Sequence, residues 1–123
     1  MIKTFIALGS LNAFLAVALG AFGAHALKSR LSPDMLDVYH TGVNYHIIHA
    51  LALLLIAVLA DKLGASSLVA ASGWALFAGI VLFSGSLYAL SLSGVKTLGA
   101  ITPLGGVAFL AGWLCLAIAA LRG

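Results

Sequence analysis

Four long apolar segments dominate this chain, and the charged residues gather in the short stretches between and beside them. A helix needs about 20 residues to cross the hydrocarbon core of a bilayer, and each segment supplies them once its flanks are included. The sequence therefore predicts an all-α integral membrane protein, an antiparallel bundle of four transmembrane helices in a single domain over residues 1–123. The helices are expected at about 3–27, 33–61, 67–93 and 98–121.

Composition points the same way. Hydrophobic residues make up 63% of the chain and charged residues only 7%, whereas a soluble domain carries roughly 25% charged residues. Such a chain cannot cover a surface that faces water, so its main expected partner is the lipid bilayer. Its six Lys and Arg residues outnumber its three acids but are scattered. Because no basic cluster could follow a phosphate backbone, a nucleic-acid partner is not expected.

The first apolar segment ends in GAFGAHA at residues 20–26, and the last three of these residues resemble a signal-peptidase site. The apolar region of a signal peptide usually spans about 7–15 residues, whereas residues 4–24 form an uncharged run of 21. Three further apolar segments follow where an exported soluble domain would be expected. We therefore interpret this stretch as the end of a first membrane helix.

The connections carry ordinary helix-capping residues. Ser32 is expected to cap the second helix, with Pro33 at its first position and Asp34 at the positive end of its dipole. The fourth helix begins either at Leu98, with a bend at Pro103, or at Pro103 itself. Three basic residues fall on each side of the membrane, so the positive-inside rule gives no orientation.

Small residues recur every three to four positions in the first, third and fourth segments. Membrane helices gain little from hiding apolar side chains from one another, and small residues matter because they let backbones approach. Repeats of this kind are typical of tight helix crossings. The glycines expected at these crossings are Gly9, Gly20, Gly23, Gly85, Gly105 and Gly112.

The second segment carries the polar stretch YHTGVNYHIIHA at residues 39–50. At 100° per residue, Tyr45, His46 and His49 fall within one third of the helix circumference. Polar residues are expensive inside a membrane and often mark a function. His25 ends the first helix on the same membrane side, while Asn12 and hydroxyl groups of the third segment could contribute. The candidate polar site is therefore His25, Tyr45, His46, His49, Ser84, Ser86 and Tyr88.

Three interpretations of this site stay open. The polar side chains tie the helices together by hydrogen bonds. Alternatively, His46 and His49, which share a helix face, bind a metal ion or haem. In the third interpretation the imidazoles line a pathway for protons or a small solute. No glutamate occurs in the sequence, which excludes the small multidrug transporters that depend on one in their first span.

No catalytic residues are expected, and the chain is predicted not to be an enzyme and to need no cofactor. Ser84 and Ser86 flank Gly85 in FSGSLY, which lacks the G-x-S-x-G pattern of a nucleophile elbow. The doublet Gly105-Gly106 lacks the glycine pattern and the lysine of a phosphate-binding loop.

Four segments carry a family resemblance: GAFGAHALK at 20–28, YHTGVNYHIIHALALL at 39–54, LFSGSLYAL at 82–90 and LGAITPLGGVAFLAGW at 98–113. Together they resemble the YgdD/YwdK-like family of small bacterial membrane proteins, the domain of unknown function 423 family. The resemblance covers almost the whole chain in order and spacing. It implies four transmembrane helices in the bacterial inner membrane, and it implies no mechanism. The residues that match are His25, Tyr45, His49, Ser84, Gly85, Ser86, Tyr88, Thr102, Pro103, Gly105 and Gly106.

Two classes of function follow. The first is a structural or accessory multi-pass protein of the inner membrane, which packs with itself or with a membrane partner. The alternative is a small transporter, a channel, or a metal- or haem-binding protein that uses the His- and Tyr-lined face of the second helix. Replacing His49 by an apolar residue of similar size separates them. Stability falls in the first case, and a binding signal disappears in the second.

Overall fold

A computed structural model describes residues 1–64 and 66–122 of the chain. Four helical spans are long and apolar enough to cross a membrane, which confirms the predicted all-α membrane fold. Two of the spans contain a short π-helical segment, and the last begins with a 3-10 turn. The elements are α1 (Ile2–Phe22) with η1 (Gly23–Leu27), α2 (Pro33–Leu63), α3 (Ser67–Gly79) with η2 (Ile80–Ser84) and α4 (Gly85–Ser93), and η3 (Lys96–Ala100) followed by α5 (Thr102–Arg122).

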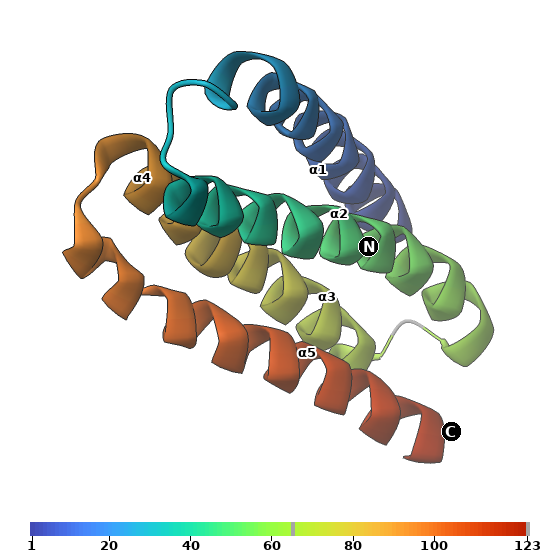
Figure 1. Ribbon diagram of the computed structural model, residues 1–123. Coiled ribbons are helices and arrows are strands. Elements are labelled where there is room, and N and C mark those ends of the chain that lie inside the picture. Colours follow the sequence, from blue (N-terminus) through green and yellow to red (C-terminus); the bar gives the residue numbers. More distant parts are fainter. Residues whose placement is uncertain (65, 123) are drawn as a thin grey trace.

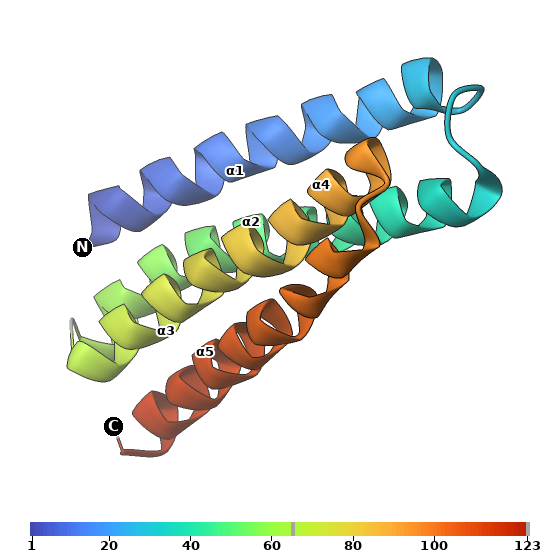
Figure 2. The ribbon, with the colours of Figure 1, turned by 90° about the vertical axis from the view of Figure 1, so that its left-hand side faces the viewer.

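The spans run up and down, so both termini lie at the same end of the bundle (Figure 1). The second view places α1 and α5 on opposite sides of a middle layer formed by α2 and the α3–α4 span (Figure 2). Accordingly, α1 packs mainly on α2, and α5 packs mainly on α3 and η2. The share of α2 and of the α3–α4 span that is buried is about twice that of α1 or α5.

The helix ends follow from local sequence. The Ser32 hydroxyl accepts a hydrogen bond from the Met35 backbone N–H at 3.2 Å, with Pro33 at the first helical position. This is the cap that the sequence predicts. Helix α5 begins at Thr102 after the separate 3-10 turn η3. The structure thus favours the second of the two predicted starts, at Pro103, to within one residue, since helix boundaries are defined only to one or two residues.

The largest apolar cluster fills the half of the bundle nearer the termini. Phe5 of α1, Leu53 and Ile56 of α2, and Val69 and Leu76 of α3 are almost fully buried in it. The buried His and Tyr side chains lie in the other half and at mid-depth. The bundle is thus held by apolar packing at one end and by hydrogen bonds at the other.

Several glycines lie at close helix crossings, where a methyl group would collide with a neighbour. A Cβ on Gly9 would lie 2.8 Å from Leu54 Cγ, and one on Gly105 would lie 2.6 Å from the Phe83 Cα. Three more of the predicted glycines have close neighbours: Val43 for Gly20, Tyr39 for Gly23 and Leu76 for Gly112. Two glycines that were not predicted do so as well, with Phe5 near Gly73 and Phe109 near Gly79.

Gly85 is the exception, and its predicted role in helix packing is wrong. A Cβ at this position would meet no atom within 4 Å. The alanines that recur along the third span do not lie on its buried face, since Ala71, Ala78 and Ala89 are exposed. The buried face of α3 instead combines Val69 and Leu76 with the small residues Ser72, Gly73 and Gly79, and the π-helical segment η2 changes which positions are buried further along the span. In lipid both faces of a helix tolerate alanine, so composition alone does not mark the contact.

Candidate functional site

His46 of α2 lies at the centre of a buried network that joins three helices. Its Nε2 is 2.9 Å from Asn12 Oδ1 of α1, and its Nδ1 is 2.8 Å from the Tyr88 hydroxyl of α4. The Asn12 side-chain N–H in turn donates to the Leu8 carbonyl at 2.8 Å. Both polar ends of the imidazole are therefore paired, and the pairs connect α2 to the helices on either side of it.

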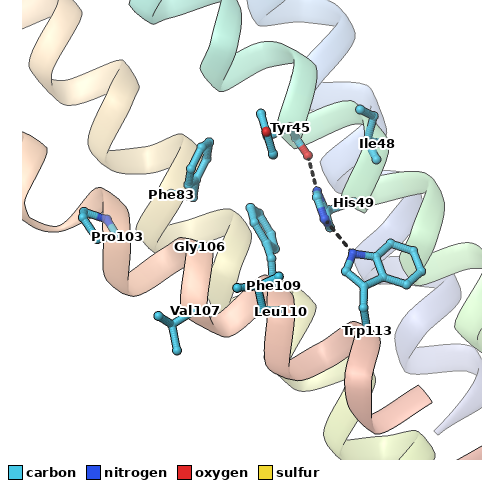
Figure 3. Close-up of a pocket in the computed structure, with 10 residues that line it drawn as sticks. All are labelled: Tyr45, Ile48, His49, Phe83, Pro103, Gly106, Val107, Phe109, Leu110 and Trp113. Atoms are coloured by element: carbon cyan, nitrogen blue, oxygen red, sulfur yellow. Dashed lines mark hydrogen bonds between the residues drawn. The ribbon is translucent and has the colours of Figure 1, made fainter. Parts of the chain in front are cut away.

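His49, one helical turn further along α2, faces α5 instead. Its Nδ1 is 2.8 Å from the Tyr45 carbonyl, and the Trp113 indole N–H donates to its Nε2 at 3.1 Å. Its ring stacks on Phe109 with centroids 3.6 Å apart and planes 11° from parallel. Figure 3 shows the two hydrogen bonds of His49.

The hydrogen-bond partners define the protonation of both rings. The Asn12 oxygen accepts, so His46 donates from Nε2, and Nδ1 of the neutral ring then accepts from the Tyr88 hydroxyl. The Tyr45 carbonyl also accepts, so His49 donates from Nδ1 and accepts the indole N–H at Nε2. A neutral imidazole has one donor and one acceptor nitrogen. We therefore assign both histidines as neutral rings in opposite tautomers.

The remaining predicted site residues do not join one cluster. Ser84 donates to the Gly42 carbonyl at 2.7 Å, which ties η2 to α2. The Ser86 hydroxyl is 2.6 Å from the Thr102 hydroxyl at the start of α5. His25 is exposed at the end of the first span, away from the other two histidines of the predicted site. The single polar site splits into separate contacts because neighbouring residues of α2 face different helices.

The geometry also bears on metal binding. Within residues 1–64 and 66–122, no three His, Cys, Asp or Glu residues are grouped closely enough to hold a metal ion. His46 and His49 use all four ring nitrogens for hydrogen bonds inside the protein. A metal ion at either ring would have to replace one of these bonds. His25, which the sequence places in the same candidate site, does not form a three-ligand group with this pair.

A groove of about 660 Å³ opens on the lateral surface between α2 and α5. His49 lies in its wall (Figure 3). Its other lining residues are mostly apolar or aromatic: Tyr45, Ile48, Phe83, Pro103, Gly106, Val107, Phe109, Leu110 and Trp113.

This groove is not among the predicted features of the chain, although the sequence contains one signal for it. Pro103, Gly106, Leu110 and Trp113 follow one another at spacings of three and four, so they share a face of α5. A glycine on an exposed helix face leaves room that any other side chain would fill. The aromatic partner of His49, Trp113, could not be identified from spacing, because the two residues are 64 positions apart.

The fold and the site define a class: a polytopic membrane protein of four helices, with hydrogen-bonded polar groups inside the bundle. The chain belongs to the family described as "Protein of unknown function (DUF423)", whose model matches residues 19–106. It is 57% identical to the UPF0382 membrane protein YwdK of Bacillus subtilis over 98% of both chains. It is also 50% identical to a UPF0382 membrane protein of Staphylococcus aureus, over 98% of this chain and 97% of the relative. No solved structure matches the chain.

Proposed function

We propose that this chain is a non-enzymatic accessory protein of the bacterial inner membrane whose polar residues hold its helices in one fixed arrangement. The observation that carries the proposal is that His46 and His49 use every ring nitrogen for hydrogen bonds within the bundle. Histidines that carry protons or bind metal need a nitrogen that can exchange its partner. Here three of the four nitrogens connect α2 to α1, α4 and α5, and the fourth, His49 Nδ1, bonds the Tyr45 carbonyl one turn earlier in α2.

A second observation agrees with this role. In the described residues every buried side-chain nitrogen and oxygen has a hydrogen-bond partner. A buried polar atom without a partner would attract a solute or an ion, because leaving it unpaired costs about 1–3 kcal/mol. The interior therefore favours a rigid scaffold over a solute pathway. A partner protein or a second copy of the chain would meet the outer faces of α1 and α5, the two least buried spans.

Nitrogen-15 NMR of histidine-labelled protein in bilayers tests the proposal. We expect two of the four histidines to give fixed signals of opposite tautomers, assigned by the variants His46→Leu and His49→Phe. The exposed rings of His25 and His40 serve as internal controls that exchange with water. Addition of Zn²⁺ or haem is expected to leave the signals of His46 and His49 unchanged.

A stoichiometric shift of the His46 or His49 signal on adding Zn²⁺ or haem would contradict the accessory role and support the binding alternative. Rapid exchange between tautomers at both rings would instead support a proton pathway. The inner-membrane location is checked separately, by fractionation of cells that produce the full chain.

A further inference from the structure

The groove between α2 and α5 extends over the depth of one membrane leaflet and not over the other. Its lining on α5 extends from Pro103, the second residue of that helix, to Trp113. Ten steps at 1.5 Å per residue span about 15 Å, which is half of a hydrocarbon core of about 30 Å. A transmembrane helix of a partner would cross the full core. The length of the groove therefore matches a lipid chain better than a helix.

The interior of the groove is open and apolar. Gly106 lines it, and a Cβ there would meet no protein atom within 4 Å. This glycine thus has no close helix neighbour to explain it, unlike the adjacent Gly105. The inner end is formed by Trp113 and His49, whose ring nitrogens are already paired with each other. The groove consequently offers its occupant a mostly apolar surface, with the exposed Tyr45 side chain as its other polar group.

The Pro103 end of the groove lies on the same membrane side as the connection between α4 and α5, which carries a positive charge. Residues 94–101 connect α4 to α5, and Lys96 is the charged residue among them. Its side chain is exposed at the start of η3. A basic residue at the membrane surface attracts anionic headgroups by about 1 kcal/mol. The connection thus places a positive charge on the membrane side where a lipid of this leaflet carries its headgroup.

We propose that the groove binds one anionic phospholipid of the leaflet on the Pro103 side, with an acyl chain along Gly106 and the phosphate near Lys96. The volume of about 660 Å³ lies within the range of specific small-molecule sites. The exposed rim residues Val107 and Leu110 let the chain enter sideways from the bilayer. This assignment goes beyond the accessory role, and the histidine NMR experiment can fail without affecting it.

Native mass spectrometry of delipidated protein, with equal amounts of dioleoyl phosphatidylglycerol and dioleoyl phosphatidylcholine added, tests the site. The wild-type chain is expected to retain one phosphatidylglycerol in preference to phosphatidylcholine. Gly106→Leu fills the groove and should weaken lipid retention about tenfold. Its control is Gly85→Leu, since Gly85 also has open space around its Cβ position but does not line the groove.

The headgroup is tested by charge. Lys96→Gln should reduce the preference for phosphatidylglycerol about fivefold. Lys28→Gln removes the same charge from the α1–α2 connection, on the same membrane side and beside α1, and should leave the preference unchanged. An equal preference in the Lys96 variant and the wild type would overturn the assignment of an anionic headgroup.

A fluorescence measurement does not depend on the folding of the Gly106 variant. In a Trp74→Phe background, Trp113 is the one remaining tryptophan and lies in the groove. Brominated phosphatidylglycerol should quench it more strongly than brominated phosphatidylcholine at the same mole fraction. Equal quenching would overturn the proposal. Full lipid retention by a folded Gly106→Leu variant would also overturn it. The same holds if the wild-type chain forms a dimer without lipid and Gly106→Leu abolishes that dimer.

Discussion

His46 and His49 lie one turn apart on the same helix, yet they occupy opposite kinds of site. His46 is enclosed by α1, α2 and α4 and pairs only with side chains. His49 pairs with a backbone carbonyl and an indole, and it lies in the wall of the open groove. A difference of three residues along α2 thus separates a group that locks three helices from one that shapes a membrane-facing surface.

The neighbouring glycines of α5 show the same contrast. Gly105 packs against the Phe83 backbone, whereas Gly106 faces the empty space of the groove. One residue of helix rotation, about 100°, is enough to move from the closed side of the helix to the open side. In this bundle the role of a residue therefore depends more on which helix face it occupies than on its residue type.

The closed side of α5 should be the most sensitive to change. A Cβ introduced by Gly105→Ala would lie 2.6 Å from the Phe83 Cα, so the two helices must separate. Overpacking of this kind costs about 3 kcal/mol. Reversible unfolding by SDS in mixed micelles measures the loss. An unfolding free energy equal to that of the wild type would show that α5 and η2 do not approach as closely as described.

His46→Leu should have the next largest effect. The substitution removes two hydrogen bonds. The Asn12 Oδ1 and the Tyr88 hydroxyl then lose their imidazole partner in the buried network. Interhelical hydrogen bonds in membranes contribute about 0.6–1.7 kcal/mol each, so a loss of about 2 kcal/mol is expected in the same SDS titration. The matched control is His25→Leu, an exposed histidine, which should change stability by less than about 0.5 kcal/mol.

His49→Phe should cost less, about 1 kcal/mol. The new ring can keep the stacking on Phe109, and the Tyr45 carbonyl lies in a regular helix with a backbone partner of its own. The Trp113 indole loses its acceptor, so its fluorescence should shift while that of Trp74 does not. Variants with each tryptophan replaced by phenylalanine separate the two signals. A loss larger than that of His46→Leu would reverse the assignment of the closed and open sites.

Much of the fold could be predicted from the sequence, because it depends on length, hydropathy and capping. Four apolar runs and the Ser32-Pro33 start of α2 are local features, and local features determine where helices begin and end. The π-helical segment η2 has no such marker. Its presence changes which residues of the third span are buried. This is one reason why a regular spacing failed to predict that Gly85 has no close helix neighbour.

The site was harder to predict, because it depends on which helix each side chain faces. His46 and His49 were identified as polar residues on a shared face of α2, and helical geometry supports that much. Their partners Asn12 and Trp113 lie 34 and 64 positions away. Such pairings are decided by how the spans are arranged around α2, and hydropathy carries no information about that arrangement.

The smallest effect, and the sharpest test of the contrast, is expected from Gly106→Ala. Its Cβ meets no protein atom, so no overpacking opposes the change. Replacing glycine by alanine in a helix favours folding by up to about 1 kcal/mol, since the unfolded chain loses freedom. The SDS titration should therefore give an unfolding free energy equal to or slightly above that of the wild type. The two substitutions at adjacent residues should therefore differ: Gly105→Ala lowers the unfolding free energy, and Gly106→Ala does not. Destabilisation by both would mean that α5 packs on both sides and that the groove is closed.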